Sequence, residues 1–254
     1  MTRCVILLPL LLAVLPGSAA ASKSPLEIPN LSGMWARAQV TTALVDIPIV
    51  GEMASRTMAV TLLRLRQEGS EVVVDEKVCR LTTQAPTRLV STTYPDAFVR
   101  AVSGNQRRGR IKVDDGRIRY VEPKQAYWRG MRPGVDVTGP MPVDSNDPRV
   151  GDVDADGQPG LTVKVGGIVD GEIFLVQRSW SELDGVLRSR NRIEGSIAWG
   201  SEEQILGASS SLLESSPKKR PAPETRKNFF RMRRVPKSAT CAEVLARRQK
   251  LFGF

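Results

Sequence analysis

Residues 111–121, IKVDDGRIRYV, and residues 161–176, LTVKVGGIVDGEIFLV, decide the fold class of this chain. In each stretch, two runs rich in β-branched residues flank an Asp-Gly pair, at 115–116 and at 170–171. Asp-Gly accepts the positive φ angles of a tight hairpin turn, so each stretch predicts two neighbouring antiparallel strands. Strands that follow one another without an intervening helix favour an antiparallel barrel or sandwich.

Runs of similar composition recur along the rest of the chain, separated by Gly, Pro, Asp and Asn. They predict further strands at 32–40, 57–66, 71–79, 97–102, 183–188, 192–199, 204–208 and, last, 228–235. A helix is expected only near the C-terminus, where Thr240 and Glu243 match a capping box and Gly253 can end the helix. We therefore expect an all-β fold, mainly an antiparallel barrel or sandwich, with a short C-terminal helix.

The N-terminus has the pattern of a secretory signal. Arg3 precedes an apolar run from Val5 to Leu15, and the small residues Ala19–Ala21 follow. The run is shorter than the roughly 20 apolar residues that span a bilayer, although an uncleaved membrane anchor is the alternative. We expect a signal peptide over 1–21, export to the periplasm or the cell exterior, and no transmembrane segment after cleavage.

The remainder, 22–254, is expected to form a single β-rich domain. Two stretches in it read as long connections: a calcium-type loop at 144–163 and a Ser/Pro-rich linker loop at 208–227. Removing the signal removes Cys4 and leaves Cys79 and Cys241. In an oxidising compartment two cysteines most simply form one disulfide, with two buried free thiols as the alternative.

Residues 151–161, GDVDADGQPGL, carry the clearest metal-binding pattern. Asp152, Asp154 and Asp156 alternate and Gly157 follows, as in positions 1, 3, 5 and 6 of a calcium loop. The backbone carbonyl of Gln158 would supply position 7. Three carboxylates this close repel one another unless a cation lies among them, so we expect a structural Ca²⁺. An Asp-rich turn that binds nothing is the alternative.

The same loop departs from an EF-hand. Val163 occupies position 12 and cannot supply the bidentate carboxylate, and no helical pattern flanks the loop. The loop instead resembles the lone DxDxDG calcium loops of bacterial exported proteins, dockerins and thrombospondin-type repeats. The missing ligands are expected from upstream or from the next turn: Asp144, Asn146, Asp147, Asp170 or Glu172.

Basic charge is concentrated at the C-terminus. Residues 217–254 contain 12 basic and 2 acidic residues, whereas residues 22–216 contain 24 basic and 25 acidic residues. This segment predicts contact with an anionic envelope component, with simple solvation of the charges as the alternative. The residues expected to make that contact are Lys218, Lys219, Arg220, Arg231 and Arg233. We expect no nucleic-acid partner, since no nucleic-acid-binding motif accompanies the charge.

A second resemblance rests on Gly33-Met34-Trp35 in the first predicted strand. This G-x-W resembles the first strand of lipocalins and other calycin barrels. The resemblance implies that a basic residue of the last strand, Arg231 or Arg233, packs over Trp35.

Catalysis has few candidates because the chain contains no histidine. Histidine-dependent triads, histidine-bound zinc and a histidine general base are therefore excluded. The paired acids Asp114-Asp115 and Glu202-Glu203 leave a carboxylate-pair hydrolase as a third hypothesis. The sequence favours first an exported, non-catalytic binding protein for a small apolar ligand, and second a structural or adhesive envelope protein using the basic segment.

Overall fold

The computed structural model describes residues 27–47, 51–85, 90–167, 170–215 and 218–254. The predicted signal peptide lies outside these residues. The strands, all in one sheet, are β1 (Gly33–Ile47), β2 (Gly51–Glu68), β3 (Glu71–Gln84), β4 (Val90–Thr93), β5 (Gln106–Asp114), β6 (Arg117–Arg129), β7 (Leu161–Gly167), β8 (Gly171–Ser189), β9 (Arg192–Ala208), β10 (Lys219–Pro221) and β11 (Phe229–Arg234). The helices are α1 (Asp96–Ala101), α2 (Cys241–Ala246) and α3 (Arg248–Phe252), with 3₁₀ turns η1 (Ser211–Leu213) and η2 (Thr225–Lys227).

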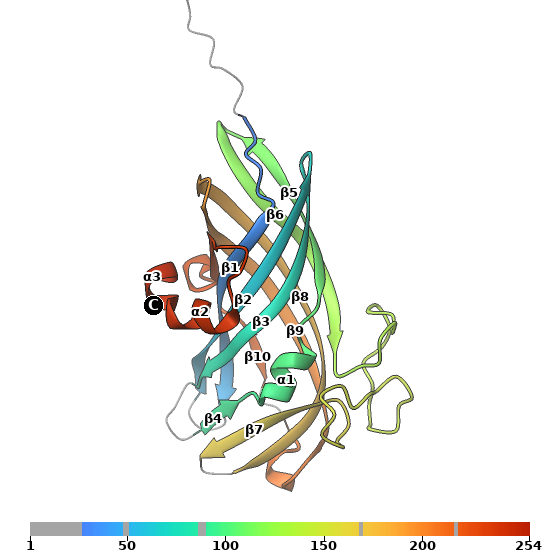
Figure 1. The fold of residues 1–254 in the computed structure, drawn as a ribbon. Coiled ribbons are helices and arrows are strands. Elements are labelled where there is room, and N and C mark those ends of the chain that lie inside the picture. Colours follow the sequence, from blue (N-terminus) through green and yellow to red (C-terminus); the bar gives the residue numbers. More distant parts are fainter. Residues whose placement is uncertain (1–26, 48–50, 86–89, 168–169, 216–217) are drawn as a thin grey trace, which may run out of the picture.

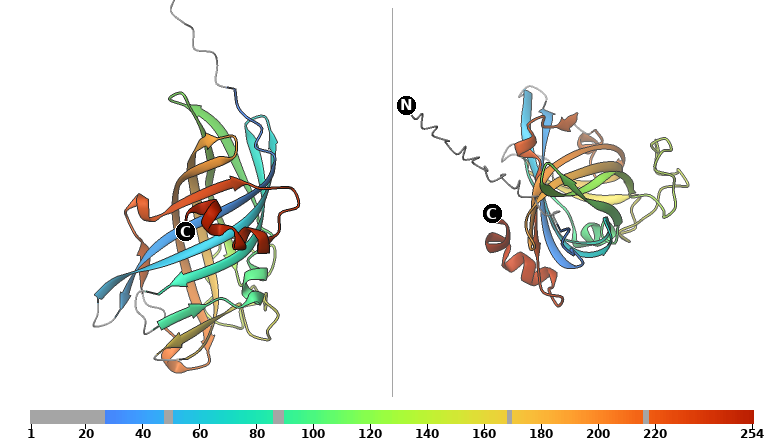
Figure 2. Two further views of the ribbon diagram at one scale, coloured as in Figure 1. Left: turned by 60° about the vertical axis from the view of Figure 1, so that its left-hand side comes forward. Right: turned by 90° about the horizontal axis from the view of Figure 1, so that it is seen from above.

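The sheet closes on itself as a barrel (Figures 1 and 2). Each strand pairs antiparallel with the next in the order β1, β2, β3, β5, β6, β8, β9 and β11, and β11 pairs back with β1. The predicted all-β class with a short C-terminal helix is confirmed, and the arrangement is a barrel rather than a sandwich. Tight turns join β2 to β3, β5 to β6 and β8 to β9, whereas longer connections join β3 to β5, β6 to β8 and β9 to β11.

The turn between β5 and β6 follows the Asp-Gly prediction. Asp115 and Gly116 have φ angles of 49° and 66°, and Asp114 pairs with Arg117 across the turn. β7 and β8 also pair antiparallel, as the second quoted stretch predicts, but the predicted turn position is wrong: Gly171 has no positive φ angle and is the first residue of β8, where it pairs with Val165. Residues 168–169 of their connection lie outside the described part of the chain.

One predicted strand is wrong. Residues 97–102 belong to α1 and its C-terminal cap instead. Phe98 and Val102 are spaced by one helical turn, and both are buried in a cluster with Leu161, Val163 and Leu175. In the helix, the two large side chains lie on one face and are buried together. A strand would also place them on one face, but it would need a neighbouring strand at this position.

The two ends of the barrel differ. At the end where β1 begins, a cluster of large apolar side chains fills the interior: Leu31, Trp35, Leu63, Leu65, Tyr120, Leu183, Ile193, Phe230 and Met232 are its largest members. At the opposite end, β4 and β7 extend the wall beyond β8, and β10 pairs with the end of β1 (Figure 1). This division leaves one end of the barrel filled and the other available for a site.

The C-terminal helices pack on the outside of the barrel (Figure 2). Val244 and Phe252 cover the outward side chains of β1 and β2, including Ala36, Ala38 and Leu62. The helical segment begins with the expected capping box of Thr240 and Glu243 and ends at Gly253, with φ 82°. It is divided into α2 and α3 at Arg247.

The predicted disulfide is confirmed. Cys79 on β3 is bonded to Cys241 at the start of α2, with a Cα–Cα distance of 5.2 Å. The two cysteines are 162 residues apart in the sequence, so the bond fixes the C-terminal helices to the outer face of the N-terminal strands.

The segment 208–227 contains more structure than a linker. Besides η1, β10 and η2, it buries Ala222, which is 3% exposed. The nearby Asn228 side chain accepts hydrogen bonds from Thr42 N and Trp199 Nε1 and donates one to Ala222 O. These bonds join β1 to β9 beyond the point where β11 pairs with both strands.

Candidate functional site: a cavity in the barrel

A cavity of about 900 Å³ occupies the barrel at the end opposite the filled core. Its size falls within the range of small-molecule binding sites. The strand sequences explain why the cavity starts where it does. From the filled end, inward positions on β1 carry Trp35, Arg37, Gln39, Thr41, Ala43 and Val45, and those on β2 carry Leu65, Leu63, Thr61, Ala59, Thr57 and Ser55. The inward side chains become smaller toward the open end, so they no longer meet across the barrel.

The cavity wall is apolar on one side. Leu81 of β3, Phe98 of α1 and three residues of β7 and β8 form this side: Leu161, Val163 and Leu175. Polar side chains from other strands interrupt the apolar surface. Thr57 and Thr83 share a hydrogen bond of 2.9 Å, and Thr83 is 3.0 Å from the hydroxyl of Tyr94.

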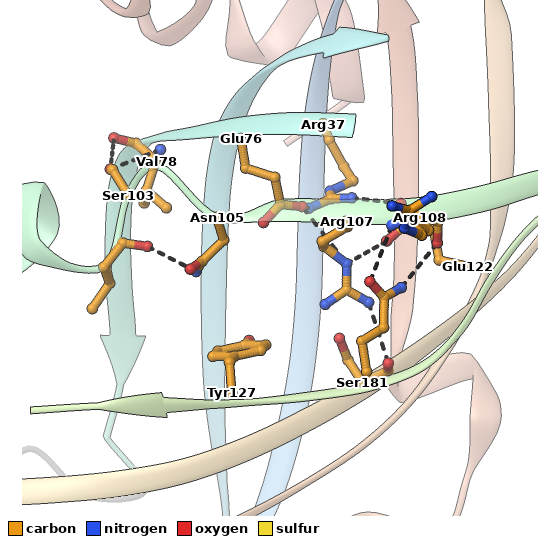
Figure 3. A network of polar contacts seen from close by, with 12 residues as sticks. Arg37, Glu76, Val78, Ser103, Asn105, Arg107, Arg108, Glu122, Tyr127 and Ser181 are labelled. Atoms are coloured by element: carbon orange, nitrogen blue, oxygen red, sulfur yellow. Dashed lines mark hydrogen bonds and ion pairs between the residues drawn. The ribbon is translucent and has the colours of Figure 1, made fainter. Parts of the chain in front are cut away.

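Four charged residues lie at the inner end of the cavity, which we call the floor network: Arg37, Glu76, Arg107 and Glu122 (Figure 3). They come from four strands, β1, β3, β5 and β6. Arg37 forms ion pairs with Glu76 and Glu122, and Arg107 Nε donates to Glu122 Oε2 at 2.5 Å. Glu122 is fully buried, whereas Glu76 is 12% exposed and lines the cavity.

Burial and charge act in opposite directions on these groups. Burial alone would lower the pKa of Arg37, but the carboxylates of Glu76 and Glu122 raise it above its ordinary value. Burial would raise the pKa of Glu122, but Arg37 and Arg107 outweigh burial and lower it. The hydroxyl of Tyr120 donates to Glu122 Oε1 at 2.7 Å, and burial raises the Tyr120 pKa. In the floor network two basic side chains are thus paired with two acidic side chains.

These charged residues were not among the sequence-predicted sites. A signal was present, because Arg37, Glu76 and Glu122 each follow a core residue by two positions: Trp35, Val74 and Tyr120. In a strand, residues two apart share a face, so a charge in phase with the core is expected to be buried. The pairing of these charges requires strands far apart in the sequence and could not be read from spacing.

Arg129, at the end of β6, provides a different cation on the cavity wall. Its Nη1 donates to Gln177 Oε1 and its Nη2 to the Tyr127 hydroxyl, both at 3.2 Å. Its Nε is buried and has no hydrogen-bond partner within the described structure. Arg129 was also not predicted as a site residue from the sequence, because a single arginine at the end of a strand has no distinguishing pattern.

The aspartate loop lies outside the barrel, just before β7. The carboxylates of Asp152, Asp154 and Asp156 each offer an oxygen, and these oxygens lie within 4.8 Å of one another. The loop is shaped partly by its own backbone bonds: Asp152 accepts from Gly157 N at 2.9 Å, and Asp156 accepts from Gln158 N at 2.9 Å. The structure therefore brings together the three carboxylates that the sequence pattern predicts.

Asp154 is the least exposed carboxylate of this cluster. It is 9% exposed, its Oδ2 accepts from Thr162 N at 3.0 Å, and its buried Oδ1 has no hydrogen-bond partner among the described residues. Burial raises the pKa of Asp154, with further contributions from the charges of Asp156 and Asp152. A cation at the cluster would satisfy the unpaired oxygen and relieve the repulsion.

Asp144 and Asp147 do not join the cluster. Asp144 is exposed and accepts from Asn146 N, while Asp147 is ion-paired with Arg149. The hydrogen bonds from Arg149 lower the Asp147 pKa to about 2. The two upstream aspartates accept hydrogen bonds within turns of their own and are not part of the group of three carboxylates.

The basic residues predicted to contact an anionic surface lie in two places. Lys218, Lys219 and Arg220 are in or beside β10 at the open end of the barrel, where Lys219 pairs with Glu203 and Arg220 with Glu52. Arg231 and Arg233 are on β11. Arg231 donates to Phe252 O, and Arg233 pairs with Glu194 at 2.7 Å.

The cation that packs over Trp35 is Arg234, in place of the expected Arg231 or Arg233. The Arg234 guanidinium carbon is 4.7 Å from the centre of the Trp35 ring. Arg234 also donates to the carbonyl oxygens of Ser32 and Asn30, at 2.7 and 2.9 Å. Its position next to Trp35 in the β1–β11 register places it over the ring, whereas Arg233 pairs with Ala36 and faces the other way.

Three of the four paired acids proposed for hydrolysis form ion pairs with basic side chains. Glu202 pairs with Arg178, Glu203 with Lys219, and Asp114 with Arg119.

None of the helices in the described ranges is long and apolar enough to cross a membrane. No protein-family model matches the chain, and no curated protein sequence matches it.

Proposed function

We propose that this chain is an exported, non-catalytic binding protein whose barrel cavity holds a small, largely apolar molecule. The observation that carries the proposal is the 900 Å³ cavity, with its apolar wall of Leu161, Val163 and Leu175 and its charged floor network. Ligand sites are typically concave and mostly apolar, with a few fixed polar groups. The disulfide supports export, because such bonds persist in oxidising compartments.

The binding proposal is tested with a neutral fluorescent probe, N-phenylnaphthylamine, whose emission rises in apolar surroundings. Ala59 faces the cavity from β2, whereas Ala54 on the same strand is exposed and is not part of the wall. Ala59→Trp is expected to weaken probe binding by about tenfold, which corresponds to about 1.4 kcal/mol, because the indole ring would occupy space in the cavity that the probe needs. Ala54→Trp is the matched control. No probe binding to the unmodified protein, or equal binding by both variants, would remove the proposal.

We further propose that Asp152, Asp154 and Asp156 bind one structural Ca²⁺. Support comes from the buried, unpaired Oδ1 of Asp154 and from the oxygen-only donor set, which suits a hard cation. Because Asp154 also accepts from Thr162 N, a bound ion would hold the start of β7, where Leu161 and Val163 line the cavity. The ion would thus stabilise the cavity wall.

Calorimetric titration with Ca²⁺ tests the metal proposal. Asp156→Asn is expected to abolish or strongly weaken binding, whereas Asp144→Asn is expected to leave binding unchanged, because Asp144 lies outside the cluster. An affinity of about 10⁻⁴–10⁻³ M is typical of extracellular calcium modules. Absence of heat at millimolar Ca²⁺ would contradict the proposal, as would equal loss of binding in both variants.

Kinship with lipocalins and other calycin barrels remains a proposal. It is supported by Gly33 and Trp35 at the start of β1 and by Arg234 of the last barrel strand lying over the Trp35 ring. The envelope-binding alternative has weaker support, since most of the basic side chains assigned to it have partners within the chain. Co-sedimentation with anionic vesicles at low ionic strength would distinguish this alternative.

A further inference from the structure

Arg129 differs from the other arginines of the cavity in how its charge is met. Arg37 and Arg107 are ion-paired with Glu76 and Glu122 in the floor network. Among the described residues, no carboxylate forms an ion pair with Arg129. Its hydrogen bonds to Gln177 and Tyr127 go to neutral oxygens, and its buried Nε has no partner in the part of the chain that the structure describes. Within the described ranges, Arg129 is thus a half-buried cation that forms no ion pair; Glu203, which faces Gln177 across β8 and β9 and lines the same cavity, is paired with Lys219.

Such an arrangement favours an anion. A guanidinium has five N–H donors, and the bonds to Gln177 and Tyr127 use two of them. Burying a cation away from water is costly unless an opposite charge or hydrogen bonds compensate for it. A carboxylate, sulfate or phosphate group would supply charge-assisted hydrogen bonds to the planar guanidinium, which is well shaped to bind such groups. The Tyr127 ring, 5.1 Å from the guanidinium carbon, holds the side chain in place.

The surroundings of Arg129 indicate where the rest of the molecule would lie. Arg129 pairs with Gln177 on β8, and the next inward residues toward the open end of that strand are Leu175 and Ile173. Toward the floor, the inward residues are Ser179 and Ser181. From position 177 to position 173 the strand rises about 13 Å. An apolar chain could therefore extend from Arg129 along this wall.

We infer that the cavity selects amphiphiles with an anionic group and an apolar chain, and that Arg129 is the residue that binds the anion. This inference rests on the proposed binding function and names its ligand class. The apolar wall supplies affinity, and Arg129 supplies selectivity between an anionic molecule and a neutral molecule of the same length. Lys218 at the rim is exposed, so its charge is met by solvent and does not require a ligand.

The experiment compares dodecanoate with dodecanol, two molecules that share a chain length and differ in the head group. Each displaces N-phenylnaphthylamine from the unmodified protein, from Arg129→Gln and from Arg129→Lys. Arg117→Gln is the matched control, because Arg117 is on the same strand but is exposed and distant from the cavity wall. Far-UV circular dichroism and probe binding confirm that each variant is folded.

The unmodified protein is expected to bind dodecanoate more tightly than dodecanol by roughly ten- to a hundredfold, the range for a charged hydrogen-bonding contact. Arg129→Gln is expected to remove this preference by weakening dodecanoate binding far more than dodecanol binding, Arg129→Lys to retain part of the preference, and Arg117→Gln to leave the binding of both molecules unchanged. Equal binding of the two molecules by the unmodified protein would overturn the inference without using any variant. A preference that persists in Arg129→Gln would overturn it as well, with the binding function left intact.

Failure of the binding function gives a different result. If neither the neutral probe nor dodecanol binds the unmodified protein, the proposed function fails, and the assignment of Arg129 fails with it. If the probe binds and Ala59→Trp blocks it, the cavity is the binding site, and the head-group comparison alone decides the role of Arg129.

Discussion

Replacing Glu122 with glutamine tests whether the floor network holds the barrel together. Glu122 is fully buried and accepts from Arg37 Nη1 at 3.0 Å, from Arg107 Nε at 2.5 Å and from the Tyr120 hydroxyl at 2.7 Å. Glutamine keeps the size of the side chain but removes its charge. Two buried guanidinium groups then depend on Glu76 alone for compensation.

The expected cost follows from this geometry. Removing one partner of a buried ion pair typically destabilises a protein by about 3–5 kcal/mol, because the remaining charge stays buried without compensation. For a domain of this size, the corresponding fall in Tm is about 6–20 °C. Glu182→Gln is the control, because Glu182 is an exposed carboxylate on β8. Its unfolding free energy is expected to remain within about 0.5 kcal/mol of the unmodified protein.

Urea unfolding, followed by circular dichroism at neutral pH, measures both variants. The pH dependence provides a second check. Because the folded-state pKa of Glu122 is lowered, its stabilising contribution is complete above its ordinary value of 4.5 and is lost as the pH falls through the lower folded value. The difference between the unmodified protein and Glu122→Gln should therefore shrink in acid. An unfolding free energy for Glu122→Gln equal to that of the control would refute the reasoning.

Three further predictions concern other parts of the chain. Replacing Cys79 and Cys241 together with serine should lower the unfolding free energy by about 2–5 kcal/mol, because the bond closes a long loop; unchanged urea unfolding would contradict this. In EDTA, the Tm should decline as the pH rises through the raised pKa of Asp154. Asp154→Asn should abolish that decline and also the stabilisation by Ca²⁺. The same decline of Tm with pH in the variant would disprove the role of Asp154. Arg234→Met should lower the unfolding free energy by about 1–3 kcal/mol and change the tryptophan fluorescence, because it removes the cation over Trp35 and the hydrogen bonds to Ser32 and Asn30. An unaltered emission spectrum and an unaltered unfolding free energy would contradict the packing of Arg234 over Trp35.

Local patterns account for the parts that the sequence predicted. The Asp115-Gly116 turn and the capping box at Thr240 involve residues that are close in the chain, so their chemistry is visible in the sequence. The aspartates at 152–156 are brought together by a short loop and were predicted for the same reason. The disulfide was predicted from the number of cysteines that remain after signal removal rather than from any knowledge of their distance.

Nonlocal packing explains the errors. Residues 97–102 are rich in aromatic and β-branched residues, as a strand would be, but α1 forms, and its side chains are buried against β7 and β8, which come much later in the sequence. Arg231 or Arg233 was expected to cover Trp35, but Arg234 covers it, because the register of β11 against β1 decides which arginine faces the ring. A shift of one residue reverses the face of every side chain on a strand.

The sequence by itself determined that this chain forms antiparallel strands, that two cysteines are available to pair and that three carboxylates gather before β7, since periodicity and spacing are local properties. The tertiary structure alone decided that the sheet closes, that the inward side chains of β1 and β2 become too small to fill one end, and that Arg37 and Glu122 form an ion pair whereas Arg129 forms none with the described residues. The physical reason is that a cavity and a counter-charge are relations between strands distant in the chain, and only pairing and register bring those strands together.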